Sequence, residues 1–376
     1  MVLAVPVSSV LKTTCCALAL CVLALPAAAQ PALRGITVGP IESSQHKDRG
    51  YGSDKSRALL DELVRIGANA VSITPFGRLW SLSSTHIDAS FEWPVSENER
   101  AVADFIADAK ARGLRVLLIP HLWVETGGWR GDLELGSPEA WAAYQRAYRD
   151  FVLRWASLAQ RAGADLFSIG VECKSWSGRF GPFWSELIRA VRARFQGQLT
   201  YSANWDEADD VLFWDQLDFI GINAFYPLAD HEGASYAEYA RGAQQALERA
   251  ASLQALVQKP VLFVELGYTT RDNAAVKPWL WPDTMQDLKP NEWEQARALA
   301  ALLGAAASQP WIAGQFLWRY YADLDDVSQE ASWGFSPHGK LAERVLQNVF
   351  GVPWAGDNPE HGDARHGRMI TPRRLE

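Results

Sequence analysis

The chain has 376 residues, of which 48% are hydrophobic and 21% are charged, and its formal net charge is −8. This is the composition of an ordinary globular protein with ample apolar content for a large core, at a length that a single α/β domain can reach. The negative charge is spread along the chain, which argues against a polyanion such as nucleic acid as a partner and favours a neutral or cationic ligand.

The first 29 residues predict a secretory signal peptide. A weakly basic start with Lys12 precedes the apolar run from Thr13 to Pro26, and Ala27-Ala28-Ala29 supplies the small residues of a cleavage site. The run is too short for a comfortable membrane span, so we expect no stable membrane insertion after cleavage and a secreted or periplasmic protein. An uncleaved anchor or a misassigned start codon is the alternative.

Cysteine and tryptophan are used unevenly. Cys15, Cys16 and Cys21 lie inside the predicted signal peptide, which leaves Cys173 alone in the predicted mature chain. A single cysteine forms no internal disulfide and no Cys-based zinc site. The chain has 17 tryptophans, and tryptophan is favoured where a flat apolar face meets an amphipathic ligand.

A helix, a glycine and an apolar segment follow one another repeatedly along the chain. The glycines of this pattern are Gly67, Gly113 and Gly163, with a weaker copy at Gly197. Glycine can adopt the left-handed conformation that ends a helix, and each apolar segment begins shortly afterwards. The segments are nearly all apolar rather than alternating, which is typical of parallel strands buried on both faces. The pattern predicts a parallel α/β fold.

Eight such strands are predicted. In chain order they are Ile36–Gly39, Ala70–Thr74, Val116–Pro120, Leu166–Val171, Leu199–Ala203, Phe219–Ala224, Val261–Glu265 and Gln315–Trp318. Eight strands alternating with helices predict a single-domain (β/α)8 TIM barrel over residues 30–353. The strand count and the lack of a Gly-rich phosphate loop disfavour the main alternative, a doubly wound sheet. Residues 354–376 are polar and charged, and we expect them to be disordered.

Two predicted helices begin with capping signals. Ser96 and Glu99 have the spacing of a capping box ahead of an apolar helix face. Ser137 followed by Pro138 predicts an N-cap with proline at the first helical position. This second helix is expected to continue to about Arg161.

Two glutamates stand at the ends of apolar strands. Glu172 follows the fourth predicted strand, and Glu265 ends the seventh. TIM-barrel enzymes carry their active sites at the C-terminal ends of the strands, and an unpartnered buried carboxylate costs several kcal/mol. Two facing carboxyl groups can act as general acid and nucleophile in glycoside hydrolysis. The alternative is that either glutamate only pairs with a loop arginine.

Further polar and aromatic residues follow other predicted strands. The candidates for substrate binding from these positions are Arg78, Trp80, His121, Trp123 and Trp205. Trp129, Trp176 and Trp279 lie in predicted loops and are further candidates to stack on sugars, whereas Trp141, Trp155, Trp184 and Trp311 lie in or beside helices and are expected to pack. No His-x-His or His-Glu-x-x-His motif accompanies His121, so we expect no metal, and nothing in the chain indicates another cofactor.

These features together resemble a known family. The segments that carry the resemblance, in chain order, are Leu118-Ile119-Pro120-His121, Gly128-Trp129-Arg130-Gly131, Ile169-Gly170-Val171-Glu172, the run Phe213 to Pro227, Glu265-Leu266-Gly267-Tyr268 and Phe316-Leu317-Trp318-Arg319. In this order the chain resembles glycoside hydrolase family 113 of clan A, whose activity is on β-1,4-mannans. The resemblance extends from about Gly35 to Lys340.

The resemblance implies roles for individual residues. It implies that Glu172 is the acid/base and Glu265 the nucleophile of a retaining mechanism, and that Trp318 is a platform under the sugar at the cleavage point. Tyr226 resembles the tyrosine that donates a hydrogen bond to the nucleophile. Many clan members carry Asn directly before the acid/base, where it contacts the sugar 2-OH. Val171 stands there in this chain, and Asn204 is a candidate for the missing contact.

The leading hypothesis is therefore a secreted hydrolase that cleaves a β-1,4-mannan polysaccharide or oligosaccharide. A hydrolase of another β-linked glycan, such as glucan or xylan, is the first alternative. A non-catalytic carbohydrate-binding barrel would keep the tryptophans and lose a carboxylate. A scaffold barrel would have a closed, apolar mouth, whereas the strand ends here are polar and aromatic.

Overall fold

The computed structural model describes residues 32–39, 48–91, 93–280, 288–326 and 330–352. The predicted signal peptide and the predicted disordered tail lie outside the described residues. Among the described helices, none combines the length and apolar composition that a membrane span requires.

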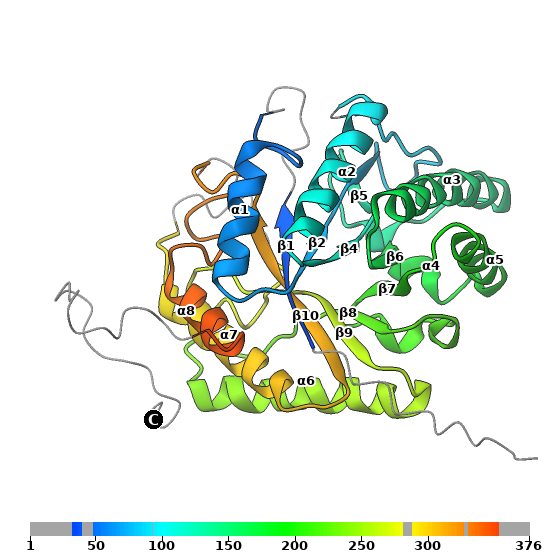
Figure 1. The fold of residues 1–376 in the computed structure, drawn as a ribbon. Helices are drawn as coiled ribbons and strands as arrows, with labels where there is room; N and C mark the ends of the chain where they lie inside the picture. Colours follow the sequence, from blue (N-terminus) through cyan, green and yellow to red (C-terminus); the bar gives the residue numbers. More distant parts are fainter. Residues whose placement is uncertain (1–31, 40–47, 92, 281–287, 327–329, 353–376) are drawn as a thin grey trace, which may run out of the picture. The chain divides into compact units, whose positions relative to one another are not determined.

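Eight parallel strands close into a barrel (Figure 1). The barrel strands are β1 (Leu33–Gly39), β2 (Ala70–Ile73), β4 (Arg115–Leu118), β6 (Leu166–Val171), β7 (Gln198–Asn204), β8 (Ile220–Asn223), β9 (Val261–Leu266) and β10 (Ile312–Tyr321). Their order around the barrel is β1-β10-β9-β8-β7-β6-β4-β2. All eight predicted strands are present, and the closure of the sheet excludes the doubly wound alternative.

Helices surround the barrel, as Figure 1 shows. They are α1 (Asp54–Arg65), α2 (Val95–Ala111), α3 (Pro138–Ala162), α4 (Lys174–Ser177), α5 (Gly181–Arg192), α6 (Tyr236–Val257), α7 (Glu292–Ala307) and α8 (Leu341–Val349), with short 3-10 turns η1 (Arg130–Asp132), η2 (Ala208–Asp210) and η3 (Trp214–Gln216). The connection from β7 to β8 contains only η2 and η3. The predicted (β/α)8 barrel is therefore confirmed. Between β7 and β8, two short 3-10 turns take the place of the α-helix.

The predicted glycine stops are confirmed at three places. Gly67, Gly113 and Gly163 have φ values of 93°, 76° and 82°, the left-handed conformation that glycine adopts without a steric penalty. The fourth copy differs, because Gly197 is not left-handed. A Cβ at Gly197 would lie 2.4 Å from the ring of Phe195, so glycine is required there by close packing.

One of the two predicted helix starts is wrong. α2 begins at Val95 with Pro94 as its N-cap, so Ser96 lies inside the first turn and forms no capping box. The carbonyl of Pro94 accepts the amides of residues 97 and 98, which starts the helix ahead of the serine. The start of α3 is confirmed, because the Ser137 side chain accepts the amide of Ala140 and Pro138 is the first helical residue.

The buried apolar residues form two groups. The smaller group fills the barrel interior with residues of the strands and their ends: Leu33, Ala70, Leu117, Ile119, Leu166, Val171, Phe219, Leu262, Val264 and Phe316. The larger group packs the outer strand faces against the helices. On β6 the interior group ends at Val171, the residue before Glu172. The polar residues at the strand ends therefore follow directly on the apolar barrel interior.

A small two-stranded sheet extends the barrel and was not predicted. β3 (Phe76–Leu79) pairs with β5 (His121–Val124) in parallel, with Arg78 opposite Trp123. These strands continue beyond β2 and β4 at their C-terminal ends. The extension therefore places His121 and Trp123 at the mouth of the barrel, where barrel enzymes hold their substrates.

Candidate active site

Glu172 occupies an unusual backbone position directly after β6. Its φ of 49° is left-handed, a conformation that costs a residue other than glycine on the order of 1–3 kcal/mol. The amide of Glu172 donates to the carbonyl of Ser202 on β7 at 2.8 Å. Its side chain is only 6% exposed. The fold therefore holds this carboxyl group in a strained and defined place.

Three donors converge on the Glu172 carboxylate. Trp129 Nε1 and Arg130 Nη2 each lie 2.8 Å from Oε2, and Asn223 Nδ2 donates to Oε1 at 3.0 Å. The left-handed Gly127 and Gly128 precede this tryptophan and arginine. The loop arginine that the alternative interpretation required is thus present. Catalysis by a pair of carboxyl groups requires a second one in the same site.

Glu265 supplies that second carboxyl group. It lies on β9, is 2% exposed, and its Oε1 is 2.9 Å from Nε2 of His121. Burial raises the pKa of Glu265 to about 7, while the charges of Arg130 and Arg319 act in the opposite direction. Burial lowers the pKa of His121 well below its usual value, so the ring is neutral. When the proton of the neutral ring is on Nε2, His121 donates a hydrogen bond to the ionised Glu265 carboxylate.

The two glutamates belong to one site. Asn223 stands opposite Glu265 in the register of β8 and β9, and its side chain reaches Glu172. The charge of Arg130 lowers the pKa of Glu265 and also pairs with Glu172 at 2.8 Å. Two carboxyl groups, one histidine and one arginine therefore share the mouth of the barrel.

Trp318, near the C-terminal end of β10, lies beside these four residues. Its ring stacks on His121, with centroids 5.9 Å apart and an interplanar angle of 18°. The guanidinium of Arg319 lies 4.7 Å from the centre of the same ring. The peptide bond between the two residues is cis. The structure therefore places Trp318 next to the His121–Glu265 pair.

Tyr226 does not make the predicted contact. Among the described residues, no hydrogen bond joins it to Glu265, and His121 supplies the donor instead. The Tyr226 ring is buried and packs against Trp205 and Phe263, with centroid distances of 6.0 and 6.3 Å. Tyr226 follows the correct strand, but its ring packs against other aromatic rings and forms no hydrogen bond with Glu265 in the described residues.

Val171 stands where many clan members carry asparagine, and in this structure an amide from another strand contacts Glu172. The Val171 side chain is part of the barrel interior, where it cannot contact a sugar. Asn204 lies at the end of β7, half-buried, and its amide donates to Asp206 at 2.9 Å. The buried amide that contacts Glu172 is that of Asn223, which was not predicted as a site residue. Its signal in the sequence was a polar residue ending the apolar strand Ile220–Asn223.

Aromatic residues form two groups beside the site. On the β3–β5 extension, Trp123 is 50% and Trp80 69% exposed, and the guanidinium of Arg78 lies 5.8 Å from the centre of the Trp123 ring. After β7 and β9, Trp205 and Trp279 stack with centroids 5.6 Å apart, and Trp279 is 47% exposed.

The other tryptophans differ in how well the structure matches their predicted roles. Trp129 hydrogen-bonds to Glu172. Trp176 was wrongly predicted as a sugar-stacking residue, because the one-turn helix α4 carries it into the core against Trp184. Trp141, Trp155 and Trp184 are buried, as predicted.

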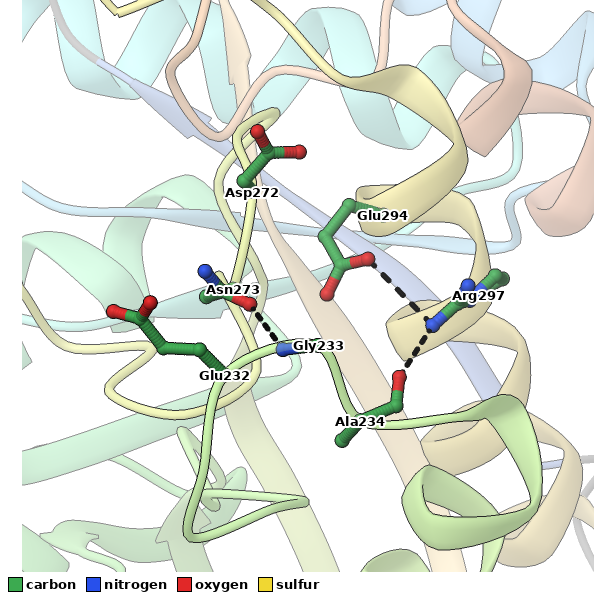
Figure 2. A pocket seen from close by; sticks show the side chains of 7 residues that line it. All are labelled: Glu232, Gly233, Ala234, Asp272, Asn273, Glu294 and Arg297. Atoms are coloured by element: carbon green, nitrogen blue, oxygen red, sulfur yellow. Dashed lines mark hydrogen bonds and ion pairs between the residues drawn. The ribbon is translucent and has the colours of Figure 1, made fainter.

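A separate pocket lies between the loops after β8 and β9 and the start of α7. Figure 2 shows its lining: Glu232, Gly233, Ala234, Asp272, Asn273, Glu294 and Arg297. Asn273 accepts the Gly233 amide at 2.8 Å, and Arg297 donates to the Ala234 carbonyl at 2.9 Å. The lining contains neither catalytic candidate and no aromatic ring. We therefore interpret these contacts as ties that hold the two loops.

Comparisons with known proteins agree with this geometry. The model of Glycoside Hydrolase Family 113 matches residues 43–340. A family 113 β-1,4-mannanase solved as a complex is 26% identical, with a TM-score of 0.71 over 85% of this chain and 99% of that chain. The family 113 β-mannanase AaManA from Alicyclobacillus acidocaldarius, in complex with ManMIm, is 26% identical, with a TM-score of 0.74 over 85% and 97%.

More distant structures share the fold alone. A Faecalibacterium prausnitzii β-glucuronidase is 16% identical, with a TM-score of 0.57 over 85% of this chain and 49% of that chain. No curated protein matches the chain. The family model covers most of the sequence, including both glutamates and His121. The chain therefore belongs to glycoside hydrolase family 113.

Proposed function

We propose that this chain is a retaining endo-β-1,4-mannanase that uses Glu172 as acid/base and Glu265 as nucleophile. The observation that carries the proposal is the shared site: two buried carboxyl groups at one barrel mouth, connected through Arg130 and Asn223. The mannan specificity is supported by the two family 113 mannanases to which the chain is similar.

In the first step, Glu172 gives its proton to the glycosidic oxygen while the bond from that oxygen to the anomeric carbon breaks. Glu265 attacks the same carbon with the oxygen that His121 does not hold, and a glycosyl ester forms. The hydrogen bond from His121 to Oε1 leaves Oε2 of Glu265 as the attacking atom. A retaining reaction of this kind needs carboxyl groups about 5–5.5 Å apart.

In the second step, Glu172 takes a proton from a water molecule, and the water oxygen attacks the anomeric carbon. The ester bond breaks, and Glu265 leaves as a carboxylate. Two inversions at the same carbon preserve its configuration. Each glutamate ends in the protonation state in which it began.

Endo action is supported by aromatic groups on separate sides of the carboxyl pair. Trp123 belongs to the extension of β4. Trp205 and Trp279 stack on each other after β7 and β9, which lie two and four strands from β4 in the strand order, so that β9 is opposite β4. Flat, partly exposed indole rings suit the apolar faces of sugar rings. A chain that contacts both groups would be cut in its interior.

The first experiment measures reducing-sugar release from β-mannan, glucomannan, β-glucan and xylan. We expect the wild type to act on mannans, and Glu172→Gln and Glu265→Gln each to lose at least about 10²-fold. Glu186→Gln, on the exposed face of α5, is the matched control and keeps full activity. Hydrolysis of another polymer with the same losses would keep the mechanism and reject mannan. Polymer binding without turnover would reject the enzyme.

The stereochemistry is tested separately by following the first product by proton NMR. A retaining enzyme releases the β-anomer first, and mutarotation then produces the α-anomer. Early appearance of the α-anomer would reject the ester intermediate at Glu265.

We also propose export from the cytoplasm, supported by the predicted signal peptide over residues 1–29. A polymer too large to enter the cell is then accessible. Expression in a bacterial host followed by N-terminal sequencing tests this. A mature chain that begins at Gln30 supports export, and an intact start at Met1 in the cytoplasm contradicts it.

A further inference from the structure

A buried hydrogen-bond network lies directly behind Glu172. The hydroxyl of Tyr201 accepts the amide of Cys173 at 2.7 Å and donates to Oε1 of Glu207 at 2.5 Å. The other oxygen of Glu207 accepts the amide of Asn204 at 3.0 Å. One carboxylate thereby holds both the residue after Glu172 and the end of β7. We refer to Tyr201 and Glu207 as the tyrosine–glutamate pair.

The tyrosine–glutamate pair is completely buried. Both side chains have no exposed surface, and the Tyr201 ring is enclosed edge-on by Trp184 and Phe213, at 5.6 and 5.3 Å between centroids. Burial raises the pKa of Glu207 to about 7, and the hydrogen bond from Tyr201 acts in the opposite direction. A carboxyl group at this depth is unfavourable unless each of its oxygens is occupied, as they are here.

The contacts meet at the strained residue. The peptide groups on both sides of the Glu172 Cα are tied to β7: its own amide donates to Ser202, and the next amide donates to Tyr201. The φ of 49° is disfavoured for glutamate, so the surrounding structure must impose it. With both flanking amides fixed, the direction of the bond from Cα to Cβ is fixed as well.

We propose that Tyr201 and Glu207 are positioning residues for Glu172, and that they hold its backbone in the conformation that presents the carboxyl group to the leaving-group oxygen. This inference rests on the proposed role of Glu172 as acid/base. Neither side chain reaches the barrel mouth, so both act through the backbone of residues 172 and 173.

The test uses Tyr201→Phe and Glu207→Gln in the full chain. Phenylalanine keeps the ring and removes the hydroxyl that accepts the Cys173 amide. Glu207 accepts hydrogen bonds from the Tyr201 hydroxyl and the Asn204 amide, and glutamine would turn an NH2 group, itself a donor, toward one of them. The matched controls are Tyr239→Phe and Glu294→Gln, because Tyr239 on α6 donates to Glu294 on α7 in another buried tyrosine–glutamate hydrogen bond, away from the site, with the two residues 1% and 8% exposed.

The readout is the dependence of kcat/KM on the leaving group. Aryl β-mannosides with a 2,4-dinitrophenolate leaving group need no proton from Glu172, whereas those with a poor leaving group, such as phenolate, do. A misplaced acid therefore slows only the second kind. We expect both variants to lose about 10²-fold on the poor leaving group, with the activated substrate within about threefold of wild type.

A general structural defect would lower both substrates equally. Active enzyme is counted by trapping Glu265 with a slow fluorinated mannoside, and assays are run well below each unfolding temperature. The double variant should be no worse than the worse single variant, because the two residues act in series.

Three outcomes overturn the inference: equal losses on both substrates, no loss on either, or the same selective loss in the Tyr239 and Glu294 controls. Failure of the proposed function is distinguishable, because then the wild type itself would not hydrolyse any β-mannoside.

Discussion

Nε2 of His121 lies 2.9 Å from Oε1 of Glu265, and both side chains are almost completely buried. A neutral histidine that donates to a buried carboxylate supports that carboxylate without adding a charge. The charges that act on Glu265 come instead from Arg130 and Arg319. The protonation state of Glu265 is therefore decided by two opposing effects on its pKa: burial raises it, and the charges of the two arginines lower it.

The first prediction concerns pH. Glu265 must be ionised to attack, and its pKa is raised to about 7, so kcat/KM should fall as the pH drops through that value. Arg319→Gln removes a charge that lowers this pKa, and the acidic limb should move to higher pH by up to about one unit. pH profiles on an aryl mannoside measure both. Arg194→Gln, in the exposed turn after α5, should leave the limb unchanged; an unmoved limb in Arg319→Gln contradicts the prediction.

The second prediction concerns stability. A carboxyl group whose pKa is raised on folding is protonated in the native state at low pH, and its ionisation at higher pH opposes folding. Glu265→Gln should have the same free energy of unfolding as wild type near pH 4. The variant should become more stable by about 3 kcal/mol above pH 8, at 1.36 kcal/mol per unit of a rise from 4.5 to about 7. Urea unfolding at both pH values measures this difference, and a difference that does not change with pH would refute it.

The third prediction concerns Asn223. Its amide donates to Glu172 from a buried position, so Asn223→Ala should lower kcat on mannan by about 10- to 100-fold through loss of orientation. Asn223→Asp should be worse, because it places a second carboxyl group against Glu172. Asn348→Ala, exposed on α8, is the control. Steady-state kinetics decide, and an active aspartate variant would show that the amide proton is not needed.

The fourth prediction concerns the stacked tryptophans. Trp279→Ala removes the exposed partner of Trp205 and should lower kcat/KM on polymeric mannan by about tenfold, the equivalent of one sugar contact. Short aryl mannosides should react at the wild-type rate, because they do not reach this ring. Trp293→Ala is matched in exposure, at 51%, and lies at the start of α7. Equal losses on polymer and short substrates would place Trp279 in the catalytic centre rather than beside it.

Most of the fold was predictable from the sequence because the barrel strands are apolar runs with glycine stops. The β3–β5 extension was not. Phe76–Leu79 is four residues long, contains a glycine and follows a proline, and it becomes a strand only by pairing with His121–Val124. Such a pairing joins residues far apart in the chain, and no local pattern reports it.

The site divides in the same way. Glu172 and Glu265 were found because a carboxylate at the end of an apolar strand is chemically out of place. The partners of Glu172 were not found as partners, since Trp129 and Asn223 are 43 and 51 residues away in the chain. Their contacts depend on how two loops and a strand meet in space. The packing of Tyr226 against Trp205 and Phe263 has the same origin.

The buried residue next to the acid/base has a practical consequence. Cys173 is the only cysteine beyond residue 21, and burial raises the pKa of its thiol to about 12. A protonated, enclosed thiol does not react with alkylating reagents, because the thiolate is the nucleophile. Labelling therefore requires the segment behind Glu172 to open. The rate at which iodoacetamide modifies Cys173, measured by mass spectrometry, therefore reports how often that segment opens, without any engineered probe.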